Sequence, residues 1–283
     1  AADLQSAGIN HSPTSPYQGR YFCSRMSLSQ QFFKLNMLNK HKILSNLPAD
    51  RLELSLFKSI DSTNEECKRI NLVKDIHVII AEEQTMGKGR LGKKWSSPSS
   101  GNIYMSISSK KIKDTEVPLS LITGLICANS INKLLKNKYI GLKWPNDIIL
   151  SKKKVGGILV EKEVLGKDIN NIIGIGINLK LHEKENWWGD LYQFGIENKR
   201  NELINTILNN FLNFFDHGIN DWSDQWQDLC VHIGSEIKVK HNNKVIDDGV
   251  FIGISSDGSL NLKLKDGKIK NYEHGEISIE GIY

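Results

Sequence analysis

The sequence predicts an α+β domain followed by a small all-β domain of the SH3 kind. Short apolar runs of strand length are interrupted by two segments, 119–136 and 202–215, in which apolar residues recur at helical spacing. Near the end, the chain holds short strands separated by Asp-Gly and Asn-Asn turns, which is typical of a small β-barrel. We therefore expect a partly flexible extension over residues 1–50, a larger domain over 51–230 and the barrel over 231–283.

The individual elements follow from local patterns. Residues 52–60 alternate roughly between apolar and polar and predict a strand. Ser62-Thr63-Asn64-Glu65 then fits a capping box, in which the Ser hydroxyl and the Glu carboxylate bind the first free N–H groups of a helix. Further strands are expected at Val78–Ala81, Ile103–Ser108, Gly141–Leu150, Val155–Val160, Ile172–Leu179, Glu236–Val239, Val250–Ile254, Leu260–Leu264 and Glu276–Ile279.

Composition excludes several classes of protein. No apolar run approaches the ~18–20 residues of a membrane-spanning helix, so we expect no membrane span. Cys23, Cys67, Cys127 and Cys230 form no CxxC pair or Cys/His cluster, which favours reduced thiols in the cytoplasm over a structural zinc site. The net charge of +5 permits a phosphate-bearing ligand or an acidic partner, but is too weak to indicate nucleic acid without a motif.

The N-terminal segment differs in composition from the rest. Residues 1–25 are rich in Ser, Gly, Pro, Gln and Asn, and we interpret them as a flexible leader with Met26 as the natural start. Residues 26–47 contain spaced Phe, Leu and Ile and no acidic residue. This pattern favours an amphipathic helix over a mitochondrial presequence, because the basic residues are Lys rather than Arg.

The basic segment Gly87–Lys94 allows more than one interpretation. Its glycines match the dinucleotide-binding fingerprint GxGxxG, which requires a helix that opens at the motif. Residues 93–101 contain too many helix breakers, so we reject that fingerprint. Four cations, no acid and a glycine-rich backbone suit a polyanion, but a solvated basic hairpin explains the same composition equally well.

Further motifs accompany this segment. They are Asp61-Ser62-Thr63-Asn64, Lys143-Trp144-Pro145-Asn146-Asp147, Lys154-Val155-Gly156-Gly157-Ile158-Leu159-Val160-Glu161 and Gly174-Ile175-Gly176-Ile177-Asn178-Leu179. In this order and spacing, and with the block Glu82–Met105, they closely resemble the biotin–protein ligases, the larger relatives of the lipoate ligases. The resemblance covers about residues 55–283, including Gly275-Glu276-Ile277-Ser278 near the end.

The resemblance implies a fold and a reaction. The fold is a class II synthetase-like mixed central sheet with helices on one side, followed by an SH3-like barrel. The reaction uses biotin, ATP and Mg²⁺ to form biotinyl-5′-AMP, and then transfers biotin to a lysine of a biotin carrier protein such as that of acetyl-CoA carboxylase. Because negative charge accumulates on the phosphoryl oxygens, cations and a metal must already be in place.

The resemblance also implies which residues are catalytic. Lys88 and Arg90 hold the junction of carboxylate and phosphate, and Lys154 reaches it from the strand hairpin. Many relatives carry Arg where this chain has Lys88, and Lys supplies charge without a bidentate fork. Asp147 guides the acceptor amine or a metal ion, and both roles stay open. Closure of the 87–101 loop over the acyl adenylate would exclude water.

The resemblance also implies which residues contact the ligands. Ser62, Thr63 and Gln84 would recognise the ureido ring of biotin through their polar groups. The biotin set is Ser62, Thr63, Asn64, Gln84, Gly87, Lys88, Arg90, Lys154, Gly156 and Gly157. The ATP set is Arg90, Trp95, Lys143, Asn146, Lys154 and Asn178, with Trp95 stacked on adenine for ~1–3 kcal/mol. Each of these residue types also has a common structural role. A tryptophan such as Trp95 packs more often than it binds a ligand, an amide such as Asn178 can serve the fold alone, and Ser62 can act only as a helix cap.

Other functions remain as alternatives. A lipoate or octanoyl ligase shares the fold but lacks the Gly87–Lys94 block in this form. A biotin-sensing repressor requires a helix-turn-helix before the catalytic domain, and residues 26–50 are too short for three helices. A purely structural role is the last alternative. We expect a monofunctional ligase, monomer or homodimer, without sequence-specific DNA binding.

Overall fold

The computed structural model describes residues 37–109, 118–137, 139–166, 168–183, 185–273, 275 and 277–281. The interpretation of residues 1–25 and most of that of residues 26–47 lie outside this part of the chain. Between residues 37 and 50 the only helix is the single turn α2 (Lys40–Ile43). Asn39 begins it, because its side-chain oxygen accepts a hydrogen bond from the Lys42 N–H.

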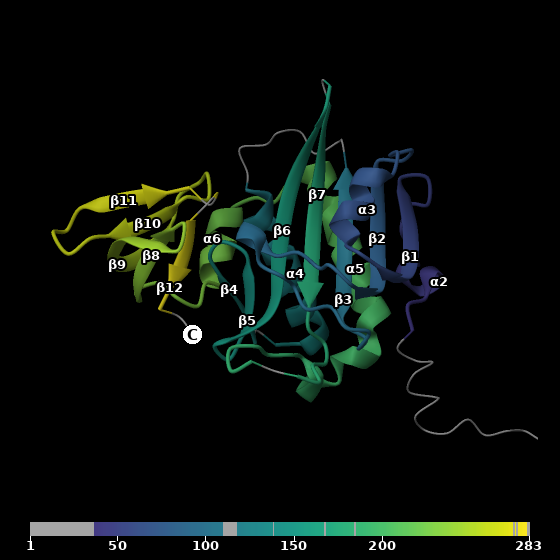
Figure 1. The fold of residues 1–283 in the computed structure, drawn as a ribbon, viewed down its shortest axis with the longest axis horizontal. Coiled ribbons are helices and arrows are strands. Elements are labelled where there is room, and N and C mark those ends of the chain that lie inside the picture. Colours follow the sequence, from purple (N-terminus) through teal and green to yellow (C-terminus); the bar gives the residue numbers. More distant parts are fainter. Residues whose placement is uncertain are drawn as a thin grey trace, which may run out of the picture. The chain divides into compact units, whose positions relative to one another are not determined.

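A seven-stranded mixed sheet forms the centre of the larger domain (Figure 1). Its order is β1-β2-β3-β7-β6-β5-β4, with β1 parallel to β2 and all other neighbours antiparallel. The strands are β1 (Leu52–Ile60), β2 (Ile76–Gln84), β3 (Ile103–Ser109), β4 (Ile140–Lys143), β5 (Asp147–Leu150), β6 (Lys153–Leu165) and β7 (Asp168–Ile177). The predicted mixed sheet is confirmed, although residues 141–150 form two strands because the chain turns at 144–146.

The two faces of this sheet have opposite chemistry. Side chains alternate along a strand, so Ile173, Ile175 and Ile177 of β7 point into the apolar core. Gly174 and Gly176 therefore lie on the other face, and the register sets Gly176 opposite Gly157 of β6. Gly174 is likewise opposite Ser106 of β3. We call this second side the glycine face, and its small residues leave room above the sheet.

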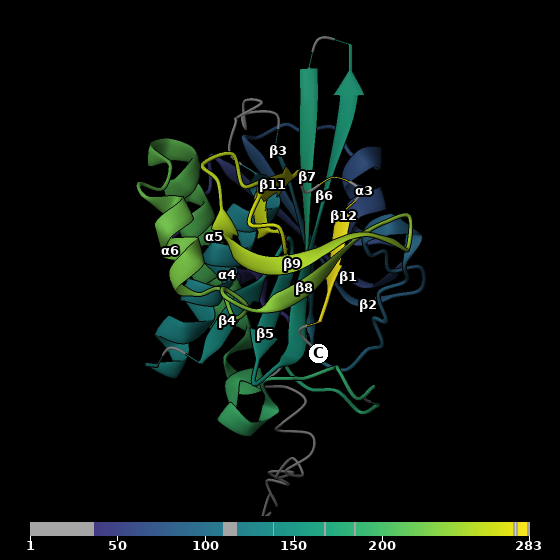
Figure 2. The same ribbon diagram turned by 90° about the vertical axis from the view of Figure 1, so that its left-hand side faces the viewer.

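Helices cover both faces. The long helices α4 (Leu119–Leu135) and α5 (Arg200–His217), with α6 (Trp222–Asp228), pack on the apolar side. The short helix α3 (Thr63–Arg69) packs on the other side, where Cys67 contacts Ile79 and Ile172. Figure 2 shows α3 across the sheet from the other three helices. The expectation of helices on one side is therefore wrong for α3.

The predicted capping box at the start of α3 is also wrong. Ser62 occupies the N-cap, but its hydroxyl makes no capping hydrogen bond. The Glu65 carboxylate accepts from Lys88 and Lys68 instead of turning back to the helix end. Two lysine partners outcompete a backbone N–H for this carboxylate, because hydrogen bonds between charged groups are stronger.

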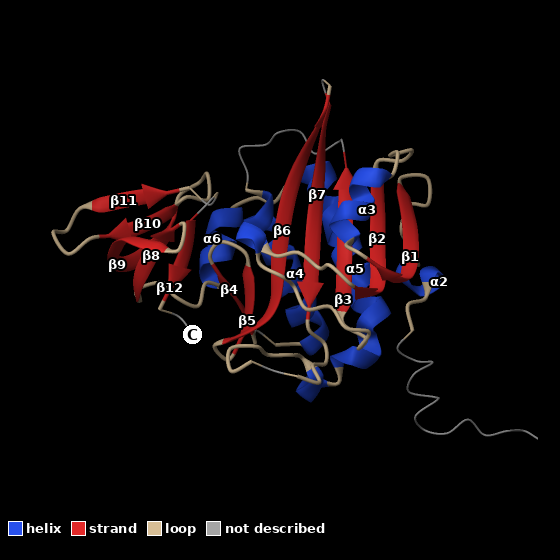
Figure 3. Cartoon of the chain, in the orientation of Figure 1, coloured by secondary structure: helices blue, strands red, loops and turns tan. Residues whose placement is uncertain are grey.

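The C-terminal domain is a five-stranded antiparallel sheet in the order β11-β10-β9-β8-β12 (Figure 3). Its strands are β8 (Glu236–His241), β9 (Lys244–Ile254), β10 (Leu260–Lys263), β11 (Ile269–Tyr272) and β12 (Ile277–Glu280). The SH3-like domain is confirmed. The Asn242-Asn243 turn has two positive φ angles, 48° and 61°, as a two-residue hairpin requires. β11 was not predicted, because its polar residues lack an alternating pattern.

The connection between the two sheets extends the larger one. The Leu142 N–H donates to the Leu229 carbonyl at 2.7 Å, and the Val231 N–H donates to the Leu142 carbonyl at 3.0 Å. Trp144 is fully buried, and its Nε1 donates to the Gly258 carbonyl at 3.0 Å. The end of β4, which carries Lys143, is thereby fixed to the C-terminal sheet.

Two further expectations concern the described part of the chain. None of its helices is long and apolar enough to cross a membrane. Cys67 and Cys127 are buried free thiols, and Cys230 is also free. Cys23 lies outside the described residues.

Candidate active site

The segment Gly87–Lys94 forms the larger part of a short hairpin that lacks a following helix. The Trp95 N–H donates to the Gly87 carbonyl at 2.9 Å, and the Gly89 N–H donates to the Lys93 carbonyl at 2.7 Å. A single 3₁₀ turn, η1 (Arg90–Gly92), forms the tip. Residues 93–101 contain no helix, which confirms that the dinucleotide fingerprint does not apply. Gly87 is required here, because a Cβ would lie 2.4 Å from the Trp95 carbonyl oxygen.

An uncharged, hydrogen-bonded set lies beside this hairpin on the glycine face, and we call it the amide end. It comprises Thr63, Asn64, Gln84, Ser97 and Ser106. Gln84 Oε1 accepts from the Thr63 N–H at 2.8 Å and from the Thr63 hydroxyl at 3.0 Å. Gln84 Nε2 donates to Ser97 Oγ at 2.8 Å. Ser106 Oγ lies 2.7 Å from Thr63 Oγ1 and 2.6 Å from Asn64 Oδ1.

A charged set, which we call the cationic end, lies further along the same face. It comprises Arg90, Trp95, Lys143, Asp147 and Lys154. Lys154 Nζ lies 2.5 Å from Asp147 Oδ1 and 5.4 Å from the centroid of the Trp95 ring. Burial lowers the pKa of Lys143 to about 8, against the opposing field of Asp147. Lys143 is paired with Asp147 in the register of β4 and β5, so both ends of the motif 143–147 meet.

The Trp95 side chain packs against glycines of the sheet. A Cβ on Gly176 would lie 2.5 Å from Trp95 Cε2, and a Cβ on Gly157 would lie 3.1 Å from Trp95 Cζ3. The indole therefore lies directly on the backbone of β6 and β7. Its Nε1 is buried and has no hydrogen-bond partner among the described residues, so one donor of this aromatic is unused.

Arg90 connects the hairpin tip to the C-terminal domain. Its guanidinium donates to the Gly275 carbonyl at 2.7 Å, to the Ile277 carbonyl at 3.1 Å and to Asn146 Oδ1 at 3.4 Å. Burial lowers the pKa of Arg90, while Asp147 acts in the opposite direction. The arginine therefore joins three segments that are far apart in the sequence.

Other residues of the predicted ligand sets have structural bonds as well. Asn146 Nδ2 donates to the Ile158 carbonyl at 2.8 Å, and Asn178 Nδ2 donates to the Gly189 carbonyl at 3.1 Å. Ser62 is buried at the helix start. Gly156 is opposite Ile177 on the apolar face, where a Cβ would lie 2.9 Å from the Gly176 carbonyl oxygen. The structure thus gives Gly156 a packing role.

Lys88 is placed differently from the other predicted cations. Its side chain reaches α3, where Nζ lies 2.5 Å from Glu65 Oε1. Sequence reasoning did not select Glu65. The Lys154 N–H also donates to the backbone carbonyl of Trp187 at 2.9 Å, a contact that does not depend on the side chain at position 187.

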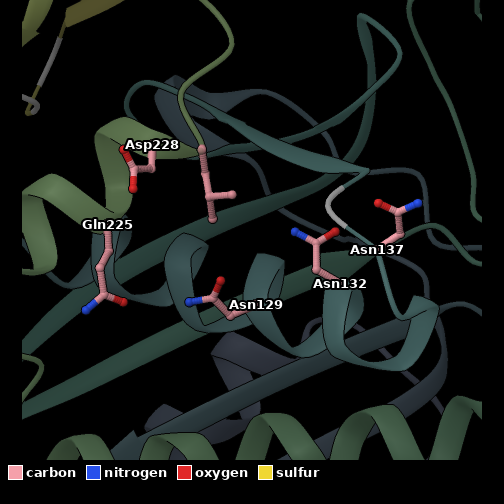
Figure 4. A pocket seen from close by; sticks show the side chains of 6 residues that line it. Asn129, Asn132, Asn137, Gln225 and Asp228 are labelled. Carbon is pink, nitrogen blue, oxygen red and sulfur yellow. The ribbon is translucent and has the colours of Figure 1, made fainter.

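A cavity of about 350 Å³ lies away from these residues, between α4 and α6 (Figure 4). Its lining consists of Asn129, Asn132, Asn137, Gln225, Asp228 and Leu229. Asn132 is already used in the fold, since its amide exchanges hydrogen bonds with both backbone groups of Ile140. No residue of either end lines this cavity. Over the described ranges, no group of three or more His, Cys, Asp and Glu side chains could hold a metal ion.

Comparison with known proteins first defines the class. Residues 56–178 match the model of the biotin/lipoate A/B protein ligase family, and residues 232–279 match that of the biotin protein ligase C-terminal domain. The two matched segments contain the amide and cationic ends and the C-terminal sheet, respectively. The fold is thus that of a protein ligase for biotin or lipoate with the added C-terminal domain.

Individual relatives narrow this class. The chain is 33% identical over 258 residues to the bifunctional ligase/repressor BirA of Escherichia coli (strain K12), covering 87% of this chain and 79% of the relative. It is 34% identical over 110 residues to the biotin–[acetyl-CoA-carboxylase] ligase of Mycobacterium tuberculosis, covering 36% and 39%. The structure matches a biotin protein ligase from Aquifex aeolicus in complex with biotin and ATP, with a TM-score of 0.66, 28% identity and coverage of 81% and 98%. The chain belongs to the biotin protein ligase family.

Proposed function

We propose that this ligase joins biotin to ATP across the amide and cationic ends, and then transfers biotin from biotinyl-5′-AMP to a lysine of a biotin carrier protein. The observation that carries the proposal is the succession of the two ends along one strand. A Cβ on Gly174 would meet Asn64 of the amide end, and a Cβ on Gly176 would meet Trp95 of the cationic end. Two residues span roughly 6.5–7 Å of strand. A ligand with an uncharged polar head and an anionic tail could therefore contact both ends.

The amide end suits the ureido ring of biotin, which carries N–H donors and a carbonyl acceptor but no charge. Thr63, Gln84 and Ser106 offer hydroxyl and amide groups that are already oriented by one another. A buried polar group left without a partner costs ~1–3 kcal/mol, so a ligand lacking matching groups is rejected. That penalty separates biotin from lipoate, whose dithiolane ring lacks a ureido group.

The cationic end suits the reacting atoms. A carboxylate oxygen of biotin forms a bond to the α-phosphorus of ATP, and the bond from that phosphorus to the bridging oxygen breaks as pyrophosphate leaves. Lys154 and Arg90 would offset the charge on the phosphoryl oxygens, with Lys143 nearby. Asp147 is the carboxylate that fits Mg²⁺ brought with the nucleotide, since Mg²⁺ prefers carboxylate and phosphate oxygens. When bound, Mg²⁺ would neutralise further phosphate charge.

Trp95 and the hairpin complete the site. The Trp95 ring can stack on adenine, a contact that contributes ~1–3 kcal/mol. Asn146 and Asn178 belong to the ATP-binding set that the family resemblance implies. In the transfer step the acceptor amine attacks the acyl carbon and AMP leaves. Asp147 either orients that amine or binds the metal. We also propose that the acceptor is a biotin carrier domain and that the protein is cytoplasmic. Its oligomeric state is proposed to be monomeric or homodimeric.

Isotope exchange between ATP and pyrophosphate tests the first step. With Mg²⁺ present, exchange is expected to depend on biotin and to be absent with lipoate. A carrier domain with its acceptor lysine should then become biotinylated, and the same domain with that lysine changed to Arg should not. Exchange with lipoate alone would indicate the lipoate ligase, and exchange with neither acid would favour the structural role.

Arg90 offers a narrower test of the hairpin. Arg90→Gly removes the bonds to the Gly275 and Ile277 carbonyls and should weaken retention of the acyl adenylate. We expect more biotinyl-5′-AMP to appear free in solution per turnover. Leu91→Gly is the matched control, because Leu91 is exposed at the same tip and has a φ of 55° that glycine tolerates. Equal release from the parent and from Arg90→Gly would refute the assignment of the loop.

The repressor alternative concerns DNA. The E. coli relative is described as a bifunctional ligase/repressor, whereas we propose a ligase without sequence-specific DNA binding. A gel-shift assay at low salt with biotin and ATP should give no specific complex. A complex that survives competition by unrelated DNA would overturn this part of the proposal.

A further inference from the structure

A chain of charged side chains joins the Gly87–Lys94 hairpin to the amide end. Glu65 Oε1 lies 2.5 Å from Lys88 Nζ and 2.9 Å from Lys68 Nζ. Lys68 Nζ also lies 2.9 Å from Glu161 Oε1. The other oxygen of Glu161 accepts from Asn64 Nδ2 at 2.6 Å. Charges alternate along this chain, so each neighbour attracts the next.

The fold brings these residues together from three elements. Glu65 and Lys68 are three residues apart on α3, a spacing at which side chains are neighbours. Glu161 is opposite Ile172 in the sheet, and Ile172 packs under Cys67 of α3. Glu161 therefore emerges from the glycine face beside the helix. The hairpin supplies Lys88 from the other side.

The members of the chain are partly shielded from water. The side chains of Glu65, Lys68 and Glu161 are 25%, 28% and 28% exposed, and that of Lys88 is 43% exposed. Hydrogen bonds from Lys88 and then Lys68 lower the pKa of Glu65. Glu65 is thus charged at neutral pH and is committed to these partners.

A neighbouring residue shows what an ordinary surface acid does on this helix. Glu66 pairs with Arg69 on α3 itself, at 3.1 Å. The same Arg69 also pairs with Asp61, directly before α3, so this pair stays at the helix and does not reach the hairpin. Glu65 differs because its partner Lys88 lies on a separate segment. The Glu65–Lys88 pair therefore acts on the position of the hairpin.

We propose that Glu65 is a positioning residue that latches the hairpin onto α3 through Lys88, while Glu161 aligns this latch with Asn64 of the amide end. This inference rests on the proposed function. The closed latch holds Gly87 beside Gln84 and Ser97, and so encloses the biotin end of the site. Lys88 acts through this contact, which gives a role to the lysine that stands where many relatives carry Arg.

Opening the latch should affect retention of ligands more than chemistry. Lys154 and Asp147 do not belong to this series of charged side chains, so they stay in place when Glu65 is changed. We expect Glu65→Gln to raise the KM for biotin and the rate of biotinyl-5′-AMP release by ~3–5-fold. The single-turnover rate of adenylation at saturating biotin should stay within about twofold of the parent.

The matched control is Glu66→Gln, which removes the same charge one residue further along α3. It should leave the KM for biotin and the release rate unchanged. Glu65→Gln in a Lys88→Met background should add nothing, because the latch is already broken. Lys88→Arg, which keeps the charge, should restore the sensitivity to Glu65→Gln. Thermal unfolding of each variant checks that the fold is intact.

The outcomes separate the inference from the function on which it rests. A parent protein without biotin-dependent exchange would remove the proposed function, and the latch with it. An active parent in which Glu65→Gln behaves like Glu66→Gln would refute the latch alone. Additive effects of Glu65→Gln and Lys88→Met would also refute it, since they would mean that the two side chains act independently.

Discussion

The amide end and the cationic end lie on the same glycine face, yet they are built on different principles. At the amide end, Thr63, Gln84 and Ser106 are neutral and bond to one another. At the cationic end, Lys154 and Asp147 meet as opposite charges. Neutral hydrogen bonds select by the match of donors and acceptors, whereas charges act over longer range and respond to salt and pH.

This difference means that the two ends can be disturbed separately. A change at the amide end should alter which acid is accepted, with little dependence on salt or pH. A change at the cationic end should alter the rate of adenylation and its electrostatic sensitivity. The glycine face contributes to both, because Gly174 and Gly176 let Asn64 and Trp95 pack directly against the backbone of β7.

The largest effect is expected from Lys154→Gln. It removes a cation from the reacting atoms and leaves Asp147 without this partner. Loss of one such group costs ~10²–10³-fold in kcat, so biotin-dependent exchange should fall by that factor. Lys152→Gln, on the exposed turn before β6, should stay within about twofold of the parent. Equal losses in the two variants would mean that Lys154 has no special position.

Much of this contrast could be predicted from the sequence. The motif 143–147 and the strand that begins near Lys154 were both expected, and the structure places Lys154 against Asp147. Polar residues at the start of α3 were also selected in advance. Such features are local, because a few neighbouring residues determine each of them.

The missed features depend on contacts between distant segments. Glu65 looks like half of a capping box until α3 is placed on the glycine face, where Lys88 comes within reach from 23 positions away. Gly176 was not selected, although the two glycines of β7, Gly174 and Gly176, were visible in the sequence. Its contact with Trp95 depends on how a loop 81 residues earlier folds back over the strand.

A second prediction concerns a substitution that disrupts the amide end alone. Thr63→Val keeps the shape but removes the hydroxyl that donates to Gln84 Oε1 at 3.0 Å. The ureido group of biotin would then lack one hydrogen-bond partner in the site, which costs ~1–3 kcal/mol, so the KM for biotin should rise by about 5–150-fold. The KM for ATP should stay nearly constant, and the biotin effect should be the same at low and high salt. A parallel rise in the KM for ATP would show that the two ends are not separable.

The smallest effect, and the most specific to the cationic end, is a dependence on pH set by Lys143. Its pKa of about 8 lies below the ordinary 10.5 because burial disfavours the charged form. Bound phosphate favours the charged form, so affinity for ATP should be full below pH 8 and should weaken as the pH rises through 8. We expect the KM for ATP to rise ~3–10-fold between pH 7 and pH 9, with the KM for biotin unchanged. Lys143→Met should flatten the profile.

The unliganded protein should respond to the same group in the opposite direction. Between pH 8 and 10.5 the unfolded chain still holds the Lys143 proton while the folded chain has released it, so this group's contribution to folding stability rises with pH. Urea unfolding of the parent and of Lys143→Met at pH 7.5 and 9.5 isolates that contribution. Opposite signs for ATP affinity and for stability would identify Lys143 as a charge that is costly to bury and is kept for its phosphate ligand. Equal signs would place the pH dependence elsewhere.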